Sequence, residues 1–152
     1  MFGRFLILIL LAGSLLRAET VDTTAVQPYE EESWMTSSKL HMYLGIGAVA
    51  SGVVAGLSAP DGESGTKYEV HRASAYTAVV LAGAAVGTGL AYHWDDINLE
   101  YGSDDPDNIH FVLGTGGALM MLAAVATAPG GEHPGLGMAG LAAMAISIKV
   151  TW

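Results

Sequence analysis

Residues 71–94 read HRASAYTAVVLAGAAVGTGLAYHW, a run of small and apolar residues that begins with one histidine and ends beside another. A helix rising about 1.5 Å per residue needs about 20 residues to cross the hydrocarbon core of a bilayer, about 30 Å thick. Ionisable side chains are rare in such helices and are functional by default. Three further apolar runs of similar length lie near 41–58, 109–128 and 134–151. The sequence therefore predicts four membrane-spanning helices.

The composition favours the same class. Of the 152 residues, 51% are hydrophobic and only 14% are charged, which is too apolar for an ordinary soluble domain. The 20 glycines suit membrane helices that pack closely. The chain has no cysteine, which excludes disulfides, iron–sulfur clusters, thiolate zinc sites and covalently attached c-type haem. We expect no nucleic-acid partner.

The N-terminus predicts export from the cytoplasm. Arg4 precedes the short apolar core Phe5–Leu16, so residues 1–18 are predicted to be a cleavable secretory signal peptide. An uncleaved anchor helix is the alternative, although the core is short for a membrane span. Residues 19–38 form a polar, acidic segment that we expect to be an extracytoplasmic arm.

The remaining residues, 39–152, are predicted to form one transmembrane domain. The connections between the apolar runs, 58–70, 93–108 and 129–133, are short, so consecutive helices should be antiparallel neighbours. The expected fold class is all-α: an integral membrane, up-down four-helix bundle. We expect a multi-pass protein of the cell inner (cytoplasmic) membrane whose N-terminus is extracytoplasmic after signal cleavage.

Each apolar run opens with a histidine, and the residue four positions later is always small. The histidines are His41, His71, His110 and His133, followed by Gly45, Ala75, Gly114 and Gly137. Positions i and i+4 share a helix face, so the small residue leaves a slot beside the imidazole for a flat macrocycle. Single histidines at helix ends are commonly interfacial polar residues, which is the alternative reading.

Because consecutive helices run antiparallel, these histidines fall into two pairs, one on each side of the membrane. His41 and His110 lie at the starts of helices on the outer, extracytoplasmic side of the membrane. His71 and His133 lie at the starts of helices on its inner side. Two imidazoles that face each other across a bundle are what bis-histidine haem iron requires. The sequence therefore predicts two b-type haems, with His41/His110 ligating the outer iron and His71/His133 the inner one.

Basic residues lie close to the predicted ligands. Lys39 and Lys149 are expected at the outer level and Arg72 at the inner level, where cations would compensate haem propionates. The alternative is that they anchor the helix ends at the membrane surface.

The stretch 39–152 resembles the four-helix, two-haem core of the cytochrome b-561 family. Members carry one haem-ligating histidine on each of four consecutive helices, paired first with third and second with fourth; the matching pairs here are His41 with His110 and His71 with His133. The chain departs from the family in having four rather than six helices after the signal. It also lacks a basic cluster suited to ascorbate. The resemblance implies a bacterial-type relative that works with a periplasmic partner or a quinone.

The connection 93–108 carries a fifth histidine and six acidic residues. His93 lies between Tyr92 and Trp94, so it suits an interfacial aromatic belt; alternatively it competes as an outer ligand or exchanges protons with a quinone. The acidic residues suit a solvated loop or the docking of a basic periplasmic electron carrier.

The function expected from these residues is the transfer of single electrons across the bilayer, between a donor in the membrane or on the cytoplasmic side and an extracytoplasmic partner, or in the reverse direction. The sequence has no apparent nucleophile–base pair, so we expect an electron-transfer protein, or a subunit of an oxidoreductase, rather than a bond-making enzyme. Two alternatives stay open. One is a haem-free membrane subunit that packs in a larger complex, and the other is a haem-handling membrane enzyme. Assembly into a redox complex or a homodimer is compatible with each.

Overall fold

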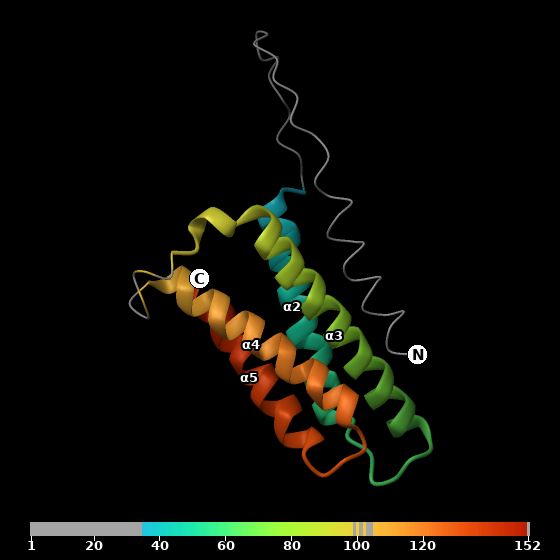
Figure 1. Cartoon of the computed structure of the whole chain (residues 1–152). Helices are drawn as coiled ribbons and strands as arrows, with labels where there is room; N and C mark the ends of the chain where they lie inside the picture. The colour runs from blue at the N-terminus through green and yellow to red at the C-terminus, as the bar shows by residue number, and fades with distance from the viewer. Residues whose placement is uncertain (1–34, 99, 101, 103–104, 152) are drawn as a thin grey trace, which may run out of the picture.

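The computed structural model describes residues 35–98, 100, 102 and 105–151 (Figure 1). The predicted signal peptide and most of the predicted arm lie outside these residues. Helices account for most of the described chain, so the fold is all-α as predicted. The elements are α2 (Ser37–Leu57), α3 (Thr66–Tyr92), the short 3-10 helix η1 (Trp94–Asp96), α4 (Pro106–Thr127) and α5 (His133–Thr151).

Three of the four helices begin about one turn earlier than the apolar pattern predicted. Thr36 caps α2 by accepting a hydrogen bond from the Lys39 N–H at 3.2 Å, and Asp105 caps α4, with Pro106 in its first turn. These first turns are polar, so hydropathy does not register them. The prediction that every helix opens on its histidine was therefore wrong for α2, α3 and α4. Only α5 begins at its histidine, His133.

The four helices form two antiparallel hairpins. α2 packs along α3 and α4 packs along α5, whereas the contacts of α2 with α5 and of α3 with α4 are far fewer. Figure 1 shows the hairpins diverging toward the end where the segment 93–105 connects them. We call this the cavity end, because a cavity lined by all four helices lies there. We call the opposite end, where 58–65 and 128–132 reverse the chain, the turn end. We call the two interfaces with fewer contacts, α2–α5 and α3–α4, the looser seams.

Small side chains hold the centre of the bundle. The buried cluster draws on all four helices: Ala48, Ala78, Ala82, Met121 and Met144. Alanine lets the backbones approach closely, and the unbranched methionines fill the remaining irregular space.

The closest backbone approach joins α4 and α5. A Cβ atom added to Gly117 would lie 2.7 Å from the Gly140 carbonyl oxygen, and one added to Gly140 would lie 2.7 Å from the Gly117 carbonyl oxygen. Neither position tolerates a side chain without moving the helices apart. This reciprocal crossing is a membrane-type contact between small residues.

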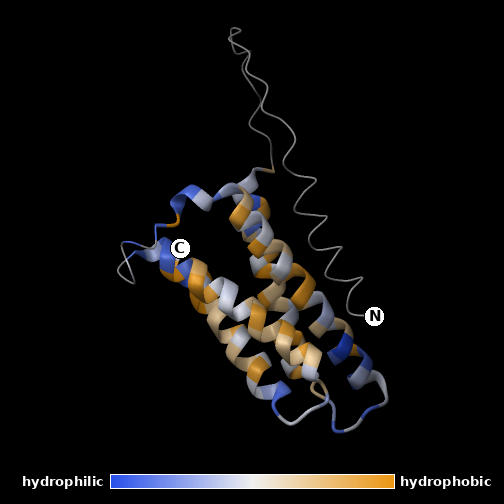
Figure 2. Ribbon diagram, in the orientation of Figure 1, coloured by the Kyte–Doolittle hydropathy of each residue, from blue (hydrophilic) through white to orange (hydrophobic). Residues whose placement is uncertain are grey.

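The outside of the bundle is apolar. Each of the four helices is long and apolar enough to cross a membrane. Figure 2 shows hydrophobic residues along the length of the helices and hydrophilic residues gathered near the helix ends and connections. Large side chains such as Leu57, Val112, Leu119, Met138 and Ile146 are exposed. Such a surface is stable in lipid but not in water, which indicates a multi-pass membrane protein.

Candidate functional site

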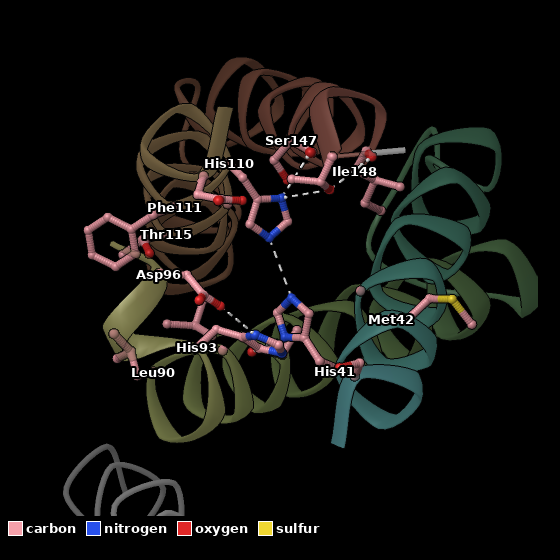
Figure 3. Close-up of a pocket in the computed structure, with 18 of the residues that line it drawn as sticks. His41, Met42, Leu90, His93, Asp96, His110, Phe111, Thr115, Ser147 and Ile148 are labelled. Atoms are coloured by element: carbon pink, nitrogen blue, oxygen red, sulfur yellow. Dashed lines mark hydrogen bonds and ion pairs between the residues drawn. The ribbon is translucent and has the colours of Figure 1, made fainter. Parts of the chain in front are cut away.

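Two histidines from different hairpins meet at the cavity end. His41 lies one turn into α2 and His110 one turn into α4, and their Nε2 atoms are 3.4 Å apart (Figure 3). The ring centroids are 5.7 Å apart and the planes are inclined at 64°. The structure therefore brings together the two residues that antiparallel threading assigned to one side of the membrane.

Hydrogen bonds to the backbone fix which nitrogen of each ring carries the proton. His41 Nδ1 lies 2.9 Å from the Ala85 carbonyl oxygen, and His110 Nδ1 lies 2.9 Å from the Ser147 carbonyl oxygen. A carbonyl oxygen can only accept, so Nδ1–H must donate in both cases. A neutral imidazole carries a single N–H, which leaves both Nε2 atoms as bare lone pairs.

Two lone pairs that face each other at 3.4 Å repel unless something lies between them. The contact requires either a second proton on one ring or a cation that binds both nitrogens. Imidazoles that ligate metals characteristically donate their other N–H to a carbonyl or carboxylate, which is the arrangement seen here on both rings.

A cavity of about 420 Å³ surrounds this pair and is lined by residues of all four helices. Its volume falls within the range of about 300–1,000 Å³ that small-molecule and cofactor sites occupy. Most of the lining is apolar, with polar groups concentrated near the helix ends.

Glycines close to the two rings keep this space open. Gly45 and Gly114, each four residues after a predicted ligand, both line the cavity. Gly89 of α3 was not singled out from the sequence, yet a Cβ atom there would lie 3.1 Å from His41 Cε1. A side chain at Gly89 would therefore displace the imidazole.

The turn end carries the second predicted pair. The rings of His71 and His133 lie 6.3 Å apart between centroids, inclined at 73°. His71 Nδ1–H donates to the Ala55 carbonyl oxygen at 2.7 Å, and His133 Nδ1–H donates to the Gly130 carbonyl oxygen at 2.9 Å. These two rings thus adopt the same tautomer, with Nε2 bare.

The small residues of the turn-end pair differ in their surroundings. A Cβ atom on Gly137 would contact the Ala124 side chain at 3.7 Å, so this glycine serves the packing of α5 on α4. Ala75 is half-buried one turn after His71.

His93 lies at the edge of the cavity, at the end of α3. Its ring is 5.8 Å from that of His41, and its Nδ1–H donates a hydrogen bond of 3.0 Å to Asp96 Oδ2. The Asp96 carboxylate orients the ring (Figure 3). His93 and His110 are thus almost equally near His41, but only His110 has its Nε2 against the Nε2 of His41.

The three predicted cations differ in position. Lys39 lines the cavity. Lys149 is exposed in the last turn of α5, at the same end of the bundle but outside the cavity lining. Arg72 is exposed near the turn end, with its guanidinium 5.9 Å from the centre of the Tyr76 ring.

Asn108 has a role that the sequence did not predict. Asp105 caps α4, and Asn108, three residues later, is only 4% exposed. Its amide oxygen accepts from the Asn98 N–H, and its amide nitrogen donates to the carbonyl oxygens of Asn98 and Gly102. One buried side chain therefore ties the connection 93–105 to α4 beside the cavity.

The residues present fit a haem better than a bare metal ion. Within the described part of the chain, no group of three or more histidine or acidic side chains could hold a metal ion. Haem iron brings four ligands of its own and needs only axial ones from the protein. Metal–imidazole bonds of about 2 Å place opposed nitrogens about 4 Å apart, so His41 and His110 need to separate by only about 0.6 Å.

Comparison with known protein families, curated proteins and solved structures finds no match to this chain. The resemblance to the cytochrome b-561 family therefore stays a prediction from the sequence.

Proposed function

We propose that this protein is a b-type di-haem membrane cytochrome that carries single electrons across the bilayer. The observation that carries the proposal is the opposed pair of bare Nε2 atoms, 3.4 Å apart, inside a largely apolar cavity. Both Nδ1–H groups are already donated to carbonyl oxygens, so the pair is preorganised to bind a cation between the rings.

In this proposal His41 and His110 hold the iron at the cavity end, and His71 and His133 hold a second iron at the turn end. A bound haem supplies one-electron oxidation and reduction at its iron. The chain fixes the rings through backbone carbonyls, and a mostly apolar lining surrounds the site. These are the means by which a protein sets the reduction potential of a haem.

The spacing of the two pairs suits transfer across a membrane. His71 is bonded to the carbonyl of Ala55, which lies 14 residues after His41 on α2. At about 1.5 Å per residue the two sites are about 20 Å apart along the helix, most of the hydrocarbon thickness of about 30 Å.

Membrane location and partners follow from the same proposal. We place the protein in the inner membrane with the cavity end outside, facing the periplasm. A quinone or a basic periplasmic electron carrier is then the partner at the acidic segment 93–108. The electrostatic attraction of such a carrier would weaken with added salt.

The test is a reduced-minus-oxidised spectrum of the purified full-length protein, with a pyridine haemochrome count. We expect two b-type haems per chain. His110→Ala should remove the haem of the cavity end and leave the other, and His71→Ala should do the converse. A well-folded, colourless protein would overturn the proposal and favour the haem-free subunit. Modified haem among the extracted products would favour the haem-handling enzyme.

A further inference from the structure

The cavity has two chemically different walls. α2 and α5 contribute one cation, Lys39, and three hydroxyls, those of Ser38, Ser147 and Thr151, of which Ser147 is buried and donates to the Met144 carbonyl oxygen. The other wall, from α3, the turn after it and α4, contributes two carboxylates, Asp96 and Asp107, together with one hydroxyl, Thr115, and the imidazoles of His93 and His110. These walls border the two loosely packed seams of the bundle, α2–α5 and α3–α4.

In Figure 3, labelled residues of α3 and α4 and labelled residues of α2 and α5 lie on opposite sides of the line that joins His41 and His110. Asp96, His93, Leu90 and Phe111 lie on the side of α3 and α4, and Met42 and Ile148 lie on the side of α2 and α5. A flat group ligated by both Nε2 atoms would stand across this line. Two of its edges would then point toward the two seams.

The charge difference selects an orientation for an amphipathic group. A carboxylate placed at the α3–α4 seam would lie near Asp96 and Asp107, whose like charges oppose it. The His93 ring already pairs with Asp96 at 3.0 Å and does not offset both acids. On the side of α2 and α5 the same carboxylate would meet the exposed Lys39 side chain and the exposed hydroxyls of Ser38 and Thr151, which favour it.

We infer that the α2–α5 seam is the subsite for the carboxylate edge of the porphyrin at the cavity end, with Lys39 as its cation. The inference rests on the proposed haem function and specifies its binding mode. The opposite, apolar edge then lies against Leu90, Ile97 and Phe111 at the α3–α4 seam. Lys149, which the sequence grouped with Lys39, takes no part in this subsite because it lies outside the cavity lining.

The test compares three single-charge variants of the full chain with haem bound. Lys39→Gln removes the inferred partner. Lys149→Gln removes a cation at the same end of the bundle but outside the cavity, and Asp96→Asn removes an anion from the opposite wall. Resonance Raman spectra report the propionate bending vibrations, which respond to hydrogen bonding of the carboxylates, and potentiometry reports the midpoint potential of each haem.

We expect Lys39→Gln to shift one propionate bending band and to lower the potential of one haem, since loss of a nearby cation favours the oxidised iron. Lys149→Gln should leave the band in place. Asp96→Asn should raise the potential without moving the band, because it touches no propionate. A haem-loaded Lys39→Gln protein with an unshifted band, or a shift that follows Asp96→Asn instead, would overturn the orientation and leave the haem function intact. A wild-type protein without haem would overturn both.

Discussion

The Gly117–Gly140 crossing predicts a sharp penalty for the smallest side chain. In Gly117→Ala the new Cβ atom would lie 2.7 Å from the Gly140 carbonyl oxygen and 2.8 Å from Met144 Cγ. Ordinary contact begins at 3.4 Å, so α4 and α5 must separate by about 0.7 Å (3.4 − 2.7). Inserting a methyl group into a close-packed contact costs about 1–3 kcal/mol.

Gly116→Ala is the matched control, because a Cβ atom there meets nothing within 4 Å. Both variants gain the helix propensity of alanine over glycine, about 1 kcal/mol, so this term cancels in their comparison. We therefore expect Gly117→Ala to be less stable than Gly116→Ala by about 1–3 kcal/mol. Denaturant titration in detergent micelles, followed by circular dichroism, measures the difference.

The same variant should disturb the site as well as the fold. α5 supplies the Ser147 carbonyl oxygen that holds His110 at 2.9 Å, so a displaced α5 loosens that ring. On the proposed function, the absorption band of one haem should broaden in Gly117→Ala and stay sharp in Gly116→Ala. Equal stability of the two variants would refute the helix crossing itself, whether or not haem binds.

Three further outcomes follow from the geometry. On the proposed function, His93→Ala should retain both haems in a pyridine haemochrome count, whereas His110→Ala should retain one; the reverse result would make His93 the ligand. On the proposed function, Gly89→Val should alter the spectrum of the cavity-end haem, because a Cβ atom there lies 3.1 Å from the His41 ring. Gly87→Val, with nothing within 4 Å of its added Cβ atom, should not. Asn108→Ala removes three hydrogen bonds to the connection 93–105, so limited proteolysis there should accelerate; an unchanged rate would show that the tie is dispensable.

The sequence predicted the features that follow from length and hydropathy. Four apolar runs and three short connections are enough to specify four antiparallel helices, and this threading alone assigns His41 and His110 to one end of the bundle. The hydropathy pattern placed the helix starts about one turn too late, because the capped first turns of α2 and α4 are polar. It also missed Gly89 and the Gly117–Gly140 crossing, since which glycines face a neighbour depends on how the helices are rotated.

The sequence could not predict the orientation of the imidazoles, for a different reason. The Nδ1 partners are the main-chain carbonyls of Ala85, Ser147, Ala55 and Gly130. Every residue has such a carbonyl, so no residue type marks these positions. A histidine in the sequence indicates only that a ligand is available, whereas the backbone around it decides which nitrogen is free to bind.

The two histidine pairs also bear on how the bundle is held together. Each pair joins one hairpin to the other: His41 of α2 faces His110 of α4, and His71 of α3 faces His133 of α5. Contacts between the hairpins are otherwise few, and the packing within each hairpin relies on small side chains. A metal centre ligated by both members of a pair would therefore stabilise the weakest interfaces of the fold. On the proposed function, haem binding and the association of the two hairpins are a single equilibrium, because a cation that relieves the opposed lone pairs also holds the seams together.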